Sequence, residues 1–333
     1  MEKIKALAKK LPTKNDILRI YKKSPISVFD LFVYVMLTLM AFIFIYPFIH
    51  MVTTSLKSYS DLLDVTVKWI PKNLTFKSYI TAGSVMRLPQ TFTNSVIVTV
   101  LATIGHLISC SFVAYGFARY KFPLRGFLFG IVILSILIPT QILIIPMYIT
   151  YSRMAIEIGD FTFKFLGTYL PLIIPTFFGY GLKGGLFIFL YRQYFLGIPK
   201  ALEEAATIDG CGPLKTFFRI AFPSAGSTTI VCIVLSMVWH WNDYYEPSLY
   251  LSSYDSMLVP QIVDSIKTLI TSMQEQLLSG QGNTEDLMAT QTLFHNGVTM
   301  AGTVISMSPP IIAYFFLQRK FMEGIEHSGL TGM

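Results

Sequence analysis

Residues 196–223, LGIPKALEEAATIDGCGPLKTFFRIAFP, form a polar segment in an otherwise apolar chain. Pro199 favours the first position of a helix, where its missing N–H costs nothing. Glu203 and Glu204 follow in the N-terminal half, where the helix dipole favours negative charge. Gly210 predicts the helix end, because glycine readily adopts the positive φ at which many helices stop.

A second helix is expected directly after this turn, beginning near Pro213. Its apolar residues have helical spacing and are Leu214, Phe217, Phe218, Ala221 and Phe222. In the first helix, Ala201, Ala205 and Ile208 are spaced i, i+4 and i+7, which gives a small, weakly apolar face suited to close approach by another surface. The unit is therefore helix, glycine turn, helix.

This stretch resembles the cytoplasmic signature loop of importer-type ABC permeases, whose pattern is E-A-A, three residues, G, nine residues, then I-x-L-P. The matching positions are Glu204, Ala205, Ala206, Gly210, Ile220 and Pro223, with Phe222 in place of leucine. Asp209, Pro199 and the RQYF run from Arg192 are similar to the sugar-permease branch related to the maltose system. The resemblance implies that ATPase subunits are coupled through Glu203, Glu204, Ala205, Ala206, Asp209, Gly210, Ile220 and Pro223. An amphipathic hairpin resting on the bilayer is the alternative.

The composition is that of an integral membrane protein. Of 333 residues, 53% are hydrophobic and only 14% are charged, which is too apolar for a soluble domain of this length. The net charge of +7 does not indicate nucleic-acid binding, because the basic residues cluster between apolar runs. We expect an all-α fold in which the apolar runs give six transmembrane helices, at about 28–53, 91–118, 127–151, 167–195, 224–245 and 293–317.

The basic residues also predict the orientation. Lys and Arg number 17 in the segments on one side of this six-helix arrangement, eight of them in residues 1–23, and eight on the other. The positive-inside rule places both termini and the signature loop in the cytoplasm. The expected organisation is a basic cytoplasmic segment at 1–27, a permease domain at 28–322 containing the coupling loop 196–223, and a cytoplasmic tail at 323–333.

The resemblance implies the fold of a type I ABC importer permease in a bacterial or archaeal cell membrane, surrounded by lipid. It also implies the partners: a second homologous permease, two cytoplasmic ATPase subunits and an extracytoplasmic solute-binding protein. No P-loop motif is present, so ATP and Mg are expected at the ATPase partners and no cofactor on this chain. The expected solute is a sugar or oligosaccharide, and a non-sugar solute is the alternative.

Other classes have little support in the sequence. There is no H-E-x-x-H helix and no G-x-S-x-G elbow, which argues against catalytic residues and an intramembrane enzyme. No repeat of glycine- or proline-broken spans relates two halves of the chain, as many secondary transporters have. Cys110, Cys211 and Cys232 lack metal-site spacing and are odd in number, so we expect neither a metal nor a disulfide.

Polar residues inside the apolar runs are candidates for the translocation path, because such groups normally face protein or water. The polar candidates within the spans include His106, His240 and Glu246, and the translocation path is expected at Lys183, Asn242, Asp243 and Tyr244. The run WHWNDYYEP from Trp239 resembles a stretch near the outer end of the fifth span in sugar permeases. Membrane-interface anchoring for the tryptophans, and an ion pair or snorkelling for Lys183, stay open. The glycines at 179, 181, 184 and 185 predict a break in the fourth span.

Overall fold

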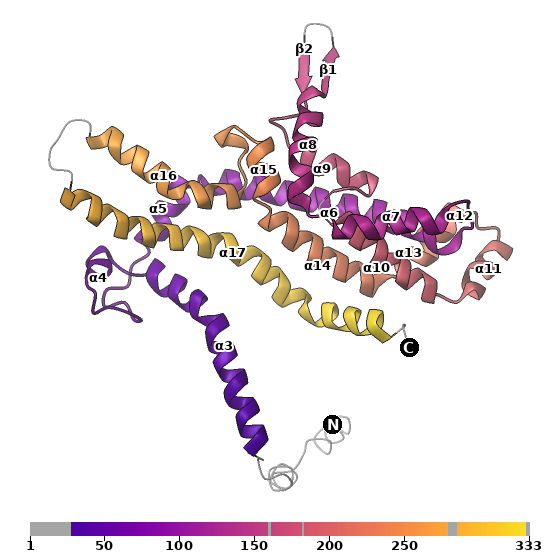
Figure 1. Ribbon diagram of the computed structural model, residues 1–333, viewed down its shortest axis with the longest axis horizontal. Helices are drawn as coiled ribbons and strands as arrows, with labels where there is room; N and C mark the ends of the chain where they lie inside the picture. Colours follow the sequence, from indigo (N-terminus) through magenta and orange to yellow (C-terminus); the bar gives the residue numbers. More distant parts are fainter. Residues whose placement is uncertain (1–27, 159–160, 182, 279–284, 331–333) are drawn as a thin grey trace, which may run out of the picture. The chain divides into compact units, whose positions relative to one another are not determined.

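The computed structural model describes residues 28–158, 161–181, 183–278 and 285–330 (Figure 1). The predicted basic segment at 1–27 and the last three residues of the predicted tail lie outside these ranges. The first described helix is α3, Val28–Ser55, which is apolar all round and continues through Pro47. Such a helix suits a lipid environment, and its 27-residue apolar part is long enough to cross a bilayer.

The connection between α3 and the next long helix is folded. It contains α4, Tyr59–Leu63, and α5, Lys77–Val85. The buried Asp61 carboxylate accepts hydrogen bonds from the backbone N of Asn73 at 2.8 Å and from its Nδ2 at 3.2 Å. These bonds favour the ionised form and hold the pKa of Asp61 below its ordinary value.

The described residues contain three helices long and apolar enough to cross a membrane, or up to five spans if each sharply bent helix pair is one. The single helices are α3, α6 (Leu88–Arg119) and the apolar part of α17 (Glu285–Leu330). One bent pair is α7 (Arg125–Leu137) with α8 (Thr140–Arg153), at 102°. The other is Pro213–Ser224 with α14 (Gly226–Asn242), at 77°.

The predicted break in the fourth span is confirmed. Residues 167–195 form α9 (Leu170–Ile173), the 3₁₀ turn η1 (Ile174–Phe178) and, after a gap, α10 (Gly184–Gly197). Gly179 and Gly181 in the gap have φ of +70° and +116°, which residues with a side chain rarely adopt. Gly184 has no room for a side chain either, because a Cβ there would lie 2.6 Å from the carbonyl oxygen of Gly179.

The chain is mostly helical, but the all-α prediction is wrong in one detail. Helix α8 leads into an antiparallel hairpin of β1 (Ala155–Ile158) and β2 (Phe161–Lys164), with Ala155 opposite Lys164. Apolar and polar residues alternate from Ile156 to Ile158 and from Phe161 to Lys164, on either side of a Gly-Asp pair in the sequence. This strand pattern is too short to outweigh the apolar runs around it.

The residues between the spans predicted at 224–245 and 293–317 are also largely helical in the described part of the chain. They form α15 (Tyr245–Tyr250), the turn η3 (Tyr254–Ser256) and α16 (Val259–Leu278), after which α17 begins. The helix predicted at 293–317 thus starts at residue 285 and runs on to residue 330, through the paired prolines and most of the predicted tail. Residues 285–293 are rich in good helix formers, and their polarity concealed this extension.

Helices α6, α10, α14 and α17 run side by side and build the core (Figure 1). Aromatic residues of α10 pack on α6, with Phe187, Tyr191 and Phe195 fully buried. Polar contacts join the same helices: Thr103 and Ser236 hydroxyls lie 3.1 Å apart, and Trp241 Nε1 donates to the carbonyl of Ser306 at 2.8 Å. Small and polar residues at these interfaces are typical of helix packing in membranes.

The close approach at Gly184 can be tested with a single methyl group. We expect Gly184→Ala to cost about 1–3 kcal/mol, because the added Cβ must displace the backbone at Gly179. The thermal midpoint of the purified protein should fall by several degrees. Gly116→Ala is the matched control: nothing lies within 4 Å of a Cβ there, and alanine favours the helix. Equal midpoints for the two variants would refute the tight contact.

Candidate functional site

The signature loop forms the predicted helix, turn and second helix. Helix α11 spans Lys200–Ile208, with Pro199 just before it at the N-cap and Asp209 at the C-cap. Gly210 then adopts a φ of +76°, so the predicted helix-ending glycine is confirmed. The next helix, α12, begins at Pro213 and spans Pro213–Thr216. The two helices are therefore joined by a turn that needs glycine at Gly210.

The small residues of α11 divide between two faces. Glu204, Ala205 and Ile208 are exposed, Ile208 by 86%. Ala206 is only 4% exposed and faces the interior of this chain. The surface free to meet another protein is thus the one that carries Ala205 and Ile208, whereas Ala206 anchors the helix.

An ion pair fixes α11 to the end of α6. Arg119 Nε donates to Glu203 Oε1 at 2.7 Å, and Arg119 Nη2 donates to the carbonyl of Ile198 at 2.7 Å. The two side chains are only 8% and 17% exposed. In a sequence, a basic residue at the end of a span indicates membrane topology. No sequence feature therefore identified Arg119 as the partner of Glu203.

The second half of the loop enters the core. After α12 come a π-helical turn, η2 (Phe217–Ala221), and α13 (Phe222–Ser224). Phe217 is 1% exposed, and its ring lies 5.2 Å from that of Tyr115 on α6. Ile220 is half-buried and Pro223 is exposed. The predicted apolar stripe is therefore split, because Leu214 and Phe218 stay exposed while Phe217 and Ala221 are buried.

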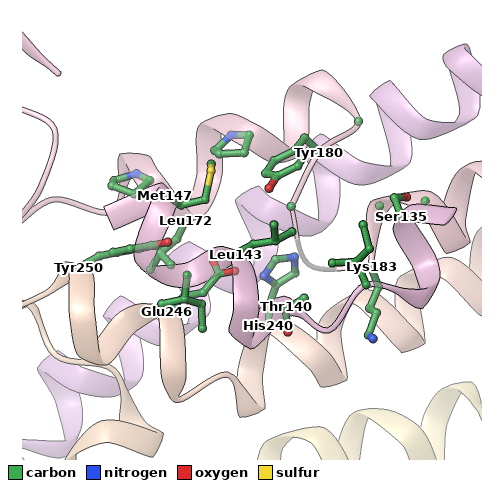
Figure 2. A pocket seen from close by; sticks show the side chains of 18 of the residues that line it. Ser135, Thr140, Leu143, Met147, Leu172, Tyr180, Lys183, His240, Glu246 and Tyr250 are labelled. Atoms are coloured by element: carbon green, nitrogen blue, oxygen red, sulfur yellow. The ribbon is translucent and has the colours of Figure 1, made fainter. Parts of the chain in front are cut away.

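A cavity of about 100 Å³ lies among interrupted helices (Figure 2). Its lining includes residues at the α7–α8 bend, the glycine gap before α10 and the start of α15. The polar lining side chains include Lys183, His240, Glu246, Tyr180 and Tyr250. His240 is 7% exposed, and its ring stacks on that of His106 at 5.3 Å between centroids.

The predicted path residues lie at different distances from this cavity. Lys183 lines it and has a positive φ of 62° at the N-cap of α10, an uncommon conformation for a residue with a side chain. Asn242 is the last residue of α14 and is exposed, and Asp243 follows as its half-buried C-cap. Tyr244 is exposed, and its hydroxyl donates to Asp264 Oδ2 at 3.0 Å. Only Lys183 of the four lines the cavity.

Within the described ranges, no three His, Cys, Asp or Glu side chains are grouped in a way that could hold a metal ion. Cys110 and Cys232 are buried, Cys211 is partly exposed, and all three are free thiols. Cys110 lies beside the histidine stack, with its Sγ 3.6 Å from His106 Nδ1. Cys110 and Cys232 therefore contribute packing within the helix bundle.

Comparison with known proteins places this chain in a family. Residues 107–326 match the family described as the binding-protein-dependent transport system inner membrane component. The chain belongs to this family. It is thus a permease component of a membrane transport system that works with a binding protein, and it resides in the inner membrane.

Relatives match along nearly their whole length. The chain is 28% identical over 295 residues to the arabinooligosaccharides transport system permease protein AraQ of Halalkalibacterium halodurans, covering 88% of this chain and 93% of that one. It is 30% identical over 286 residues to the probable starch degradation products transport system permease protein AmyC of Thermoanaerobacterium thermosulfurigenes, covering 86% and 91%.

A solved structure has a similar fold. It is a bacterial ABC transporter involved in the import of the acidic polysaccharide alginate, with a TM-score of 0.66 and 22% identity. The match covers 88% of this chain and 96% of the other. At this identity the likeness supports the fold alone, namely that of an ABC importer permease.

The ion pair at α11 gives a direct test. Arg119→Ala leaves the shielded carboxylate of Glu203 without its partner, and we expect the loss of about 2 kcal/mol or more of stability. The thermal midpoint should fall, and solute uptake by the assembled transporter should fall with it. Lys215→Ala is the control, since Lys215 is a basic residue of the same loop with an exposed side chain. The same midpoint and uptake in both variants would contradict the role of Arg119.

Proposed function

We propose that this chain is one of two permease subunits of an ATP-driven importer for a sugar or oligosaccharide. It crosses the membrane six times with both termini in the cytoplasm, and it pairs with a second, homologous permease. Two cytoplasmic ATPase subunits bind and hydrolyse ATP with Mg, and an extracytoplasmic binding protein delivers the solute. The chain itself performs no catalysis and holds no nucleotide.

The signature loop is the single observation that carries this proposal. Helix α11 is short, ends sharply at Gly210 and presents Ala205 and Ile208 outward. A helix that docks in another protein's cleft and transmits force must resist sliding and bending. The bond of Glu203 to Arg119 gives α11 that resistance, because it links the docking helix to the 32-residue helix α6. ATP-driven closure of the ATPases then moves the helix bundle through α11.

Sugar as the solute is supported by the descriptions of relatives that match along nearly their whole length. These relatives are described as permeases for arabinooligosaccharides, starch degradation products and lactose. A non-sugar solute is the second candidate, because other relatives are described as permeases for osmoprotective compounds and for sn-glycerol-3-phosphate. Purifying the whole complex with its binding protein and identifying the retained solute by mass spectrometry separates the two. A retained sugar supports the proposal, and retention of a different solute class contradicts it.

The orientation has a labelling test. With Cys211 replaced by serine, we expect cysteine introduced at the exposed Ser60 of α4 to react with an impermeant thiol reagent added to intact cells. Cysteine at the exposed Lys215 should react only after the cells are opened. The remaining thiols, Cys110 and Cys232, are buried. Labelling of the Lys215 position from outside would overturn the orientation.

A substitution in the glycine turn tests coupling to the ATPases separately from assembly of the complex. Gly210→Val places a β-branched residue at φ +76°, which costs about 1 kcal/mol or more and tilts α11 relative to α12. We expect the complex to assemble, with uptake falling at least tenfold and ATP hydrolysis no longer dependent on solute. Asparagine tolerates this conformation, so Gly210→Asn is the matched control and should retain uptake. Solute-stimulated hydrolysis and uptake at wild-type rates in Gly210→Val would remove α11 as the coupling element.

A further inference from the structure

The cavity lies where three helices are interrupted. Ile138 and Thr140 belong to the α7–α8 bend, Gly179 and Gly181 lie in the gap before α10, and His240 and Glu246 flank the break between α14 and α15. Irregular backbone within membrane helices is tolerated where protein buries it or where it lines a cavity. Broken helices also frame solute sites in other transport folds. The meeting of three breaks therefore makes this cavity a candidate binding site.

Polar side chains from several elements line this cavity. They include Glu246, Tyr151, Tyr180 and Tyr250. Tyr151 and Tyr250 are only 6% and 3% exposed. His240 Nε2 is buried and has no hydrogen-bond partner among the described residues. Buried polar groups are normally hydrogen-bonded, so His240 Nε2 has room for a bond from an occupant of the cavity.

The side chains converge on the cavity from different elements. In Figure 2, Tyr180 points down toward His240, Glu246 lies beside His240, and Tyr250 approaches from the other side. The Lys183 side chain points away from this group. The rings of Tyr151 and Tyr250 meet edge to face, 5.4 Å apart, and present an aromatic wall. The centre of the site thus combines one acidic group with tyrosine hydroxyls, an imidazole and aromatic surface.

This combination selects among ligand classes. A carboxylate only accepts hydrogen bonds, whereas tyrosine hydroxyls both donate and accept, which matches the hydroxyl groups of a sugar. Aromatic surface suits the apolar face of a sugar ring. A single carboxyl group is a poor site for a metal ion. A water needs about 10–15 Å³, so a cavity of about 100 Å³ has room for a group as large as one sugar ring.

We propose that this cavity holds one uncharged sugar ring of the transported solute, with Glu246, Tyr180 and Tyr250 binding its hydroxyls and His240 completing the wall. This chain then contacts the solute directly and contributes to selectivity, in addition to its role in coupling. The proposal rests on the function proposed above. The proposal goes beyond that function because it assigns a solute-binding site built only from residues of this chain.

The test uses the complete transporter in liposomes, with its binding protein and with radiolabelled maltotriose, arabinotriose and lactose as probes. Two variants change the hydrogen-bonding groups and keep shape: Tyr180→Phe with Tyr250→Phe removes two hydroxyls, and Glu246→Gln replaces one acceptor oxygen of the carboxylate with an amide donor. We expect each to lower uptake about tenfold, since one or two hydrogen bonds to the sugar are lost. Assembly and solute-stimulated ATP hydrolysis should persist. Tyr148→Phe is the control, because Tyr148 lies on α8 but is 40% exposed and is not part of the cavity lining.

The outcomes separate the two proposals. If the wild-type complex imports none of the three sugars and the solute retained on purification is not a sugar, the proposed function fails. If it imports one and both cavity variants match Tyr148→Phe, the function stands and the sugar site falls. A sugar lacking one hydroxyl gives a second test. In the wild type, its uptake should be about fivefold below that of the intact sugar. In the variant without the side-chain group that binds this hydroxyl, the two sugars should be taken up almost equally. Equal losses in the wild type and in every cavity variant would contradict direct binding.

Discussion

Arg119 and Glu203 form a charge pair largely shielded from water, and such a pair is stable only while both partners keep their positions. The pair joins α11 to the end of α6, and the second bond from Arg119 to the carbonyl of Ile198 secures the chain just before α11. Helix α11 therefore cannot swing away from α6 without leaving a shielded charge unpaired. Any displacement imposed on the loop is passed to α6.

Helix α6 connects this loop to the cavity. His106 lies 13 residues before Arg119, which is about 20 Å along the helix, and its ring stacks on His240 at the cavity wall. Gly105 beside it permits close contact with Thr176, because a Cβ there would lie 2.1 Å from the threonine hydroxyl. Movement of α6 therefore reaches both walls of the cavity, the one from α14 and the one before α10. One rigid helix thus relates the coupling surface to the proposed sugar site.

The features that the sequence predicted well are those with local causes. The sharp end at Gly210 and the break around Gly179 follow from residues that favour positive φ within a few positions. The pairing of Arg119 with Glu203 joins positions 84 residues apart, and the convergence of Tyr180 on Glu246 depends on three separate helix breaks. The sequence alone carries no signal for such long-range contacts. The hairpin β1–β2 and the early start of α17 were not predicted. Both lie beside long apolar runs, which are a stronger signal than a short alternating pattern or the helix propensity of a few polar residues.

The central claim is that the outward face of α11 docks in an ATPase subunit. It is tested most directly by placing a photo-crosslinking amino acid at Ile208, which is 86% exposed, in the assembled transporter within native membranes. We expect irradiation to join this chain to the ATPase subunit from Ile208, and not from Ile80, which is 72% exposed on α5. Crosslinks from Ile208 to lipid alone, in a complex that still hydrolyses ATP and imports solute, would contradict the account.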